Sequence, residues 1–218
     1  MSNIIIFGIK ENSEIAKFYL DNDTDHHAVA FCVDGKYMKE DTFNNLPVIA
    51  FEDIESGFSS YDHKFIAPLA PTAMGKTRQE VFNRVRGKGY DFISYISSRA
   101  TNFSTHIGKN CFILEDNTLQ PFTSIGDNVL MWSGNHIGHH STVHDHVSIT
   151  SHVVISGRCE IGSNSFFGVN SSVRDGIKVA EGTFLSLGAV LTADTLPWSV
   201  YKGISAELTK IPSTRVKF

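Results

Sequence analysis

The sequence contains few cysteines and no excess of charge of either sign. Its 218 residues include 3 cysteines, an odd number without a CxxC spacing, so neither a disulfide framework nor a cysteine zinc site is expected. We predict that Cys32, Cys111 and Cys159 are small buried fillers. With 19 basic residues against 23 acidic ones, the chain has no electrostatic support for binding nucleic acid or anionic membranes.

Segments for membrane insertion or export are also missing from the sequence. It has no run of about eighteen apolar residues, the length that a transmembrane helix requires. The N-terminus has no cationic segment followed by an apolar one, which a secretory signal would carry. We therefore expect a cytoplasmic protein without membrane association.

The glycine pattern of a dinucleotide-binding loop is absent from the first hundred residues. Only Gly8 follows the first apolar run, in the segment FGIKENSE, where G-x-G-x-x-G would be needed. A complete pyrophosphate loop is therefore not expected. Asp34 ends a second apolar run, where an acid can meet a ribose or a base, although an aspartate before a glycine is also a common turn former.

The same hundred residues alternate between strand and helix signals. Apolar runs predict strands over 3–7, 27–33, 47–51, 64–69 and 92–96. One helix is expected to be capped at Asn12-Ser13-Glu14, and an amphipathic helix is expected over 78–86. This alternation predicts a small, parallel, Rossmann-like sheet as an N-terminal domain over residues 1–100.

The second half of the chain has an internal period of six. An aliphatic or aromatic residue stands at every sixth position without a miss or an insertion, a period that neither an α-helix nor a plain strand generates. The fifteen positions are Ile107, Ile113, Leu119, Ile125, Met131, Ile137, Val143, Ile149, Ile155, Ile161, Phe167, Val173, Val179, Leu185 and Leu191. The period predicts a solenoid over 101–196 with six residues per side, followed by a tail over 197–218.

The residues between the apolar positions support flat sides joined by tight corners. A mostly small or β-branched residue stands four places after each apolar one, as expected if each side points two residues inward. Three sides make a triangular coil, so fifteen sides give about five coils. Glycines directly after the apolar residue are expected to serve turns free of Cβ constraints: Gly108, Gly126, Gly138, Gly162 and Gly168.

The repeat resembles the hexapeptide-repeat, left-handed parallel β-helix of bacterial acyltransferases. The order of a short α/β domain, hexads and a histidine-bearing coil is similar to the nucleotide-sugar acetyltransferases. That group includes the bacillosamine-pathway N-acetyltransferase, the perosamine N-acetyltransferase and the sialic-acid O-acetyltransferases. The most specific stretch covers residues 136–173 and reads HIGHHSTVHDHVSITSHVVISGRCEIGSNSFFGVNSSV.

The resemblance implies an acetyl-CoA-dependent enzyme that acetylates the amino group of a nucleotide-linked amino-deoxysugar for surface polysaccharide or glycan assembly. Acetyl-CoA would be a co-substrate, and no metal or other cofactor is expected. The family's catalytic base is the histidine two places after an apolar hexad residue, which maps onto His139, after Ile137 and Gly138. A histidine can accept a proton at neutral pH. Where the family often has a carboxylate to orient the base, this chain has His140, so Asp145 or a backbone carbonyl are alternative partners.

The resemblance also implies binding residues and an assembly. Backbone groups of Gly157 and Gly188 would bond the pantetheine amides of acetyl-CoA, with Val169 and Asn170 lining the same groove. The nucleotide would lie in the N-terminal domain, at Gly8 and Asp34. A lone prism has no second wall opposite the base, so we expect a homotrimer. Because the repeat has no insertion, no long loop leaves the prism to cover the substrate.

Three alternatives remain open from the sequence. The enzyme could acetylate a sugar hydroxyl, as in sialic-acid O-acetylation, or the solenoid could be a non-catalytic binding protein. The H-x-x-x-x-H spacing of His139 and His144 also occurs in γ-class carbonic anhydrases, which bind zinc through three histidines. That class lacks an N-terminal domain of this kind, and we expect His144, His146 and His152 to lie on the coil exterior or a subunit interface.

Overall fold

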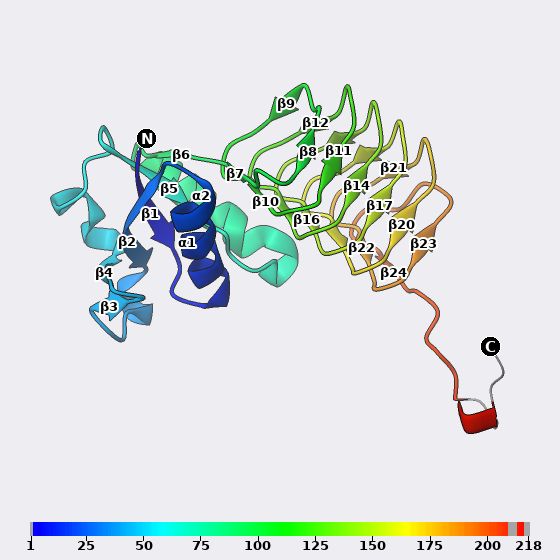
Figure 1. Ribbon diagram of the computed structural model, residues 1–218, viewed down its shortest axis with the longest axis horizontal. Helices are drawn as coiled ribbons and strands as arrows, with labels where there is room; N and C mark the ends of the chain where they lie inside the picture. Colours follow the sequence, from blue (N-terminus) through cyan, green and yellow to red (C-terminus); the bar gives the residue numbers. More distant parts are fainter. Residues whose placement is uncertain (1, 209–212, 216–218) are drawn as a thin grey trace.

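The computed structural model describes residues 2–208 and 213–215, which form a small α/β part followed by a long β-solenoid (Figure 1). The predicted tail over 197–218 therefore lies partly outside the described residues. The α/β part has two α-helices, α1 (Glu11–Asp23) and α2 (Lys76–Gly87). No helix of the described residues is long and apolar enough to cross a membrane. Four short 3-10 helices are also present: η1 (Gly35–Tyr37), η2 (Phe51–Ser56), η3 (Thr72–Gly75) and η4 (Ser213–Arg215).

The N-terminal sheet is parallel except for one hairpin at its edge. Its strand order is β3-β4-β2-β1-β5-β6, and only the β3–β4 pair is antiparallel. One side of the sheet packs on α1 and the other on α2, which buries apolar residues on both sides as parallel sheets require. The strands are β1 (Asn3–Phe7), β2 (His27–Val33), β3 (Thr42–Phe43), β4 (Leu46–Ala50), β5 (His63–Ile66) and β6 (Asp91–Phe92).

The predicted Rossmann-like sheet is thus confirmed, with three differences. The expected strand over 92–96 is split, because β6 ends the N-terminal sheet whereas β7 (Tyr95–Ile96) starts the solenoid. The predicted cap on α1 is wrong: Lys10 precedes the helix without a side-chain cap bond, and the Asn12 amide donates to the Pro68 carbonyl instead. The β3–β4 hairpin was not predicted, and its turn is Asn44-Asn45 with positive φ at both residues.

The solenoid has three parallel faces. The first face contains β7, β10 (Phe112–Ile113), β13 (Leu130–Met131), β16 (Ser148–Ile149), β19 (Phe166–Phe167), β22 (Phe184–Leu185) and β24 (Val200–Tyr201). The second contains β8 (Thr101–Asn102), β11 (Thr118–Leu119), β14 (His136–Ile137), β17 (Val154–Ile155), β20 (Ser172–Val173) and β23 (Val190–Leu191). The third contains β9 (His106–Ile107), β12 (Ser124–Ile125), β15 (Thr142–Val143), β18 (Glu160–Ile161) and β21 (Lys178–Val179).

The period of six marks the interior of this prism. Each predicted apolar residue is the second residue of its two-residue strand, and together with Cys111 and Cys159 these side chains form one continuous core. All three cysteines are free and buried, as predicted. Strand pairing extends beyond the regular repeat, from Tyr95 to Tyr201, so the boundaries drawn at 100/101 and 196/197 fall inside the strand ladders.

The corners of the coil use glycine differently from the sequence expectation. The left-handed residue is the third after the apolar one, from Asn110 (φ 55°) to Gly188 (φ 65°). Most of these residues are asparagine, histidine or glycine, which tolerate this backbone, and Asp116, Phe122 and Arg158 adopt it too. The glycines directly after the apolar residue serve close approach instead. A Cβ on Gly138 would lie 2.5 Å from the Gly157 nitrogen of the next coil, so the coils could not stack there.

Each corner is a column of residues. We name each corner after one residue that lies in it or binds to it. The His139 corner joins the second and third faces and contains Pro121, His139, Gly157 and Asp175. The Arg78 corner joins the third and first faces, contains Asn110, Asn128, His146 and Asn164, and takes its name from the arginine bound to it. The Asn170 corner joins the first and second faces and contains Asp116, Gly134, His152, Asn170 and Gly188.

A buried arginine fastens α2 to the solenoid. Arg78 is 1% exposed and donates hydrogen bonds to four carbonyl oxygens and one hydroxyl, at 2.9–3.2 Å, namely those of Leu69, Asn128, His146, Val147 and Ser148. No carboxylate is among these partners, and burial lowers the pKa of Arg78 to about 10. The guanidinium thereby satisfies corner carbonyls of the solenoid that α2 covers.

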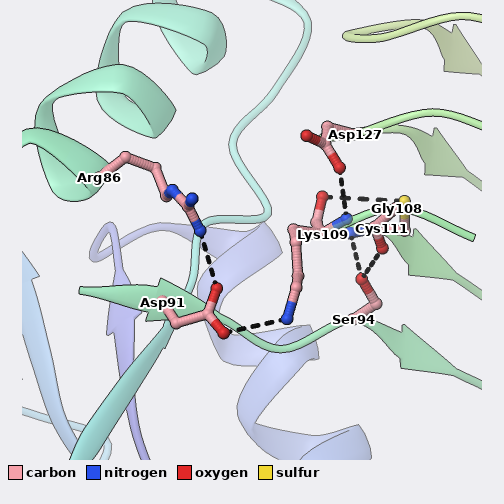
Figure 2. A network of polar contacts seen from close by, with 7 residues as sticks. All are labelled: Arg86, Asp91, Ser94, Gly108, Lys109, Cys111 and Asp127. Atoms are coloured by element: carbon pink, nitrogen blue, oxygen red, sulfur yellow. Dashed lines mark hydrogen bonds and ion pairs between the residues drawn. The ribbon is translucent and has the colours of Figure 1, made fainter. Parts of the chain in front are cut away.

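Other contacts complete the junction. Apolar residues of α1 and the N-terminal sheet share one cluster with Tyr95, Phe112 and Leu130 of the first face, so the N-terminal part covers the first three strands of that face. Figure 2 shows the crossover from β6 to β7. The Asp91 carboxylate accepts from Arg86 of α2 at 3.0 Å and from Lys109 of the solenoid at 2.9 Å.

We predict that replacing Arg78 by leucine lowers the free energy of unfolding by about 3 kcal/mol, because buried carbonyl oxygens lose their donors. Urea unfolding of the R78L variant measures this. The matched control is Arg86→Leu on the same helix, whose ion pair with Asp91 is exposed and should contribute no more than about 1 kcal/mol. Equal stability losses in the two variants would contradict the anchoring role of Arg78.

We also predict that acid weakens this junction through His146. Burial lowers the pKa of His146 and Arg78 lowers it further, against the opposing effect of Asp145. The unfolded chain then binds the proton more readily, so stability is lost as the pH falls below about 6.5. The His146→Asn variant, which matches Asn128 and Asn164 of the same corner, should lose less stability than the wild type between about pH 7 and pH 5. If the urea midpoint changed equally between the two pH values in both proteins, the prediction would be contradicted.

Candidate active site

The six clustered histidines are spread over three corners and one face. His139 and His140 lie at the His139 corner, His144 and His146 at the Arg78 corner, and His152 at the Asn170 corner, while the remaining one, in β14, faces outward from the second face. His140, His146 and His152 occupy the left-handed corner position, at φ between 58° and 65°. Backbone conformation is therefore a sufficient reason for three of these histidines to be present.

His139 is half-buried and held from both sides. Its backbone nitrogen donates to the Gln120 side chain at 2.9 Å, and its carbonyl accepts from the Arg158 nitrogen of the next coil. The ring Nδ1 lies 3.1 Å from Nδ1 of His140. One of these nitrogens must donate and the other accept, which leaves the Nε2 side of His139 for another partner.

His140 has a fixed place of its own. Its backbone is left-handed, its nitrogen donates to the Pro121 carbonyl, and its ring packs on Phe122 with centroids 4.7 Å apart. The rings of His139 and His140 meet edge to face at 5.2 Å. The sequence placed Asp145 among the possible partners of His139. Asp145 instead lies at the Arg78 corner, where its carboxylate accepts from the Asp127 nitrogen.

Gly157 makes room for the His139 ring. A Cβ on Gly157 would stand 2.8 Å from Cε1 and 2.9 Å from Nε2 of His139, and 2.9 Å from Oδ1 of Asp175. The sequence analysis did not identify Asp175 as a neighbour of His139. Successive coils contact each other at a spacing of eighteen residues, which places residues 139, 157 and 175 in one column. This spacing is the signal from which Asp175 could have been predicted.

The predicted acetyl-CoA residues do not come together within one chain. Gly157 is buried beside His139, whereas Val169, Asn170 and Gly188 are exposed at the Asn170 corner. The second face separates these two corners. Two pockets of about 420 and 520 Å³ are present at the Arg78 corner and beside α1, and neither is lined by His139.

The predicted nucleotide residues lie side by side at the carboxyl edge of the N-terminal sheet. The Gly8 nitrogen donates to the Cys32 carbonyl at 2.7 Å, and Asp34, two residues after Cys32, directly follows the end of β2. A side chain at Gly8 would collide with Ser13, and its φ of 116° also requires glycine. The Asp34 carboxylate accepts two hydrogen bonds from Arg84 of α2, at 2.5 and 3.2 Å.

His146 lies on the exterior of the coil, as predicted, but it packs against α2 and is not exposed to solvent. Its side chain is only 8% exposed, because α2 covers it and Asn128 contacts its Nδ1 at 2.9 Å. His144 is exposed near Glu160, and His152 is exposed as predicted. No group of three metal-ligating side chains is found among the described residues. His139 and His144 stand at opposite ends of the third face, on different corners.

Comparisons with known proteins agree with this two-part architecture. The family described as hexapeptide repeat of succinyl-transferase matches residues 159–193. None of the curated proteins matches the sequence. The acetyltransferase domain of PglB from Neisseria gonorrhoeae superposes with a TM-score of 0.80 at 17% identity, covering 92% of this chain and 96% of that one. PerB from Caulobacter crescentus, solved with CoA and GDP-perosamine, superposes with a TM-score of 0.77 at 16% identity, covering 92% and 93%.

A third structure, WeeI from Acinetobacter baumannii, has a TM-score of 0.56 at 15% identity and covers 88% of this chain and 94% of that one. At these identities the superpositions establish the fold only, and the chemistry must be argued from the residues of the site. The fold predicted from the sequence is confirmed, a Rossmann-like α/β domain followed by a left-handed parallel β-helix. The chain therefore carries hexapeptide repeats and has the two-part fold of the sugar acetyltransferases it resembles.

Proposed function

We propose that the protein is an acetyl-CoA-dependent N-acetyltransferase acting on the amino group of a nucleotide-linked amino-deoxysugar. The observation that carries the proposal is the arrangement of His139. One ring nitrogen is held by His140, and the other lies beside Gly157, whose missing side chain makes room for the ring. Solved structures of this fold that contain acetyl coenzyme A, or CoA with GDP-perosamine, support the same substrates.

The proposed chemistry needs one proton acceptor and no covalent enzyme intermediate. The sugar amine attacks the thioester carbon of acetyl-CoA, the C–N bond forms, and the C–S bond breaks. Nε2 of His139 accepts the proton that the nitrogen loses and returns it to the departing CoA thiolate. All three cysteines are buried, and burial raises the pKa of each thiol, so none is available as a nucleophile.

His140 acts as the positioning residue for this base. If Nδ1 of His140 accepts, then Nδ1 of His139 carries the proton and Nε2 keeps its lone pair for the substrate. The same hydrogen bond remains when His139 becomes charged during the reaction. His140 lacks the negative charge of a carboxylate, so it fixes the tautomer and the ring orientation and adds little electrostatic stabilisation.

A second copy of the chain would complete the site. The His139 corner lies opposite the first face, whose first three strands are covered by the N-terminal part of the same chain. The second face is uncharged along its outward residues, Thr101, Thr118, His136, Val154, Ser172 and Val190. A neighbour seated on this face borders both the His139 corner and the Asn170 corner, which unites the predicted acetyl-CoA residues across a homotrimer.

The nucleotide would then bind at the carboxyl edge of the N-terminal sheet. Gly8 and Asp34 stand together there, and Arg84 holds the Asp34 carboxylate in a fixed orientation. A paired carboxylate still has lone pairs that can accept from ribose hydroxyls. We place the reaction in the cytoplasm, in the assembly of surface polysaccharides or glycans.

We predict that His139→Asn lowers kcat at least about a hundredfold, because general base catalysis is lost while the corner keeps its shape. Release of free CoA thiol from acetyl-CoA, with a panel of nucleotide-linked amino sugars, measures the rate. His144→Asn at the other corner is the matched control and should retain the wild-type rate. An unchanged rate in H139N, with the oligomer intact, would refute the base. Turnover of free sialic acid alone would refute the substrate class.

We further predict that Gly157→Ala reduces kcat at least about tenfold with little loss of stability. The added methyl group would stand within 3.0 Å of His139, and the ring must move away from its working position. The control is Gly57→Ala, where an added Cβ meets nothing within 4 Å. Thermal unfolding and the thiol-release assay on both variants test this, and full activity in G157A would contradict the ring placement.

A further inference from the structure

An acidic side chain faces the reactive edge of His139 from the far side of Gly157. Nε2 of His139 and Oδ1 of Asp175 each lie 2.9 Å from the point where a Cβ on Gly157 would stand. The two atoms are therefore no more than twice that distance apart, and Gly157 has no side chain to separate them. The proposed base and a carboxylate therefore lie close together on one corner, two coils apart.

These two atoms are close enough for a single nitrogen group to bridge them. A nitrogen placed between Nε2 and Oδ1, on the side away from Gly157, can be within hydrogen-bond distance of both. An amine has enough hydrogens to donate to the imidazole and to the carboxylate at once. A hydroxyl has one hydrogen and can donate to only one of them.

The charges at this corner fit a cationic acceptor. His139 and His140 form a dyad that carries no negative charge, so Asp175 is the carboxylate of this column. Its contact with Arg158 is long, 3.8 Å, and both side chains are more than half exposed, so the ion pair is weak and leaves Asp175 open to a ligand. A bound CoA and a neighbouring subunit would exclude water and strengthen an ammonium–carboxylate contact here.

We infer that Asp175 is the residue that makes the enzyme select an amino group over a hydroxyl group, by holding the acceptor ammonium in front of His139. The ammonium loses one proton to solvent before the neutral amine attacks, and His139 takes the second proton as the C–N bond forms. The inference rests on the proposed function and deepens it, because the fold and His139 alone serve N- and O-acetylation equally. Three residues of the column then have separate roles. His139 accepts the proton, Gly157 leaves space for the His139 ring, and Asp175 recognises the amine.

The experiment compares a nucleotide-linked amino sugar with the same nucleotide sugar carrying a hydroxyl at the reacting carbon. Asp175→Asn should raise KM for the amine about tenfold or more, since a charge-assisted contact is replaced by a neutral one. Turnover of the hydroxyl substrate should stay within about twofold, and Asp175→Glu should recover part of the amine affinity. Asp62→Asn, an exposed acid in the N-terminal domain, is the control for charge removal and should change neither substrate.

The outcomes separate this inference from the proposed function. Unchanged amine kinetics in D175N, with H139N inactive, would overturn the role of Asp175 and leave the acetyltransferase standing. An equal loss on both substrates would also overturn it, because a purely structural role lowers both. If the wild-type protein acetylates none of the nucleotide-linked amino sugars, the proposed function itself fails.

Discussion

The hydrogen bonds of Arg78 set how the two halves of this protein fit together. A buried cation without a carboxylate partner is costly, and Arg78 offsets that cost by donating to the carbonyls of Leu69, Asn128, His146 and Val147. These acceptors belong to the N-terminal part and to two successive coils. The guanidinium therefore fixes α2 against one corner of the solenoid and, with the apolar cluster beneath α1, seats the N-terminal sheet over the first face.

That placement decides which surfaces remain for chemistry. The beginning of the first face is covered and α2 lies on the Arg78 corner, whereas the second face, with its two flanking corners, and the third face stay open. His139 lies on one flanking corner and Asn170 on the other. An active site built from both corners therefore needs two copies of the chain, and the unbroken repeat offers no loop that could replace the second copy. The junction at Arg78 and the proposed shared site then both follow from the same packing.

Much of the fold could be predicted from residue spacing, because every side of the coil must place an apolar residue in the interior. This requirement gives the sequence its period of six, and the buried N-terminal strands give it short apolar runs. The split of the strand over 92–96 could not be predicted, because Phe92 and Tyr95 are both apolar and buried although they enter different sheets. For the site, His139 was found only through resemblance. The left-handed backbone at His140, His146 and His152, and the column that unites His139 with Asp175, become visible only when the coils are stacked.

A crystal structure of the protein with bound CoA tests the proposed site most directly. The CoA sulfur is predicted to lie within about 4 Å of Nε2 of His139, the range of a reacting group. The pantetheine arm is predicted to run between the His139 corner of one copy and the Asn170 corner of another. A CoA thiol seated instead in the polar pocket lined by Gln79, His144 and Glu181, with the His139 corner unoccupied, would contradict the proposed site.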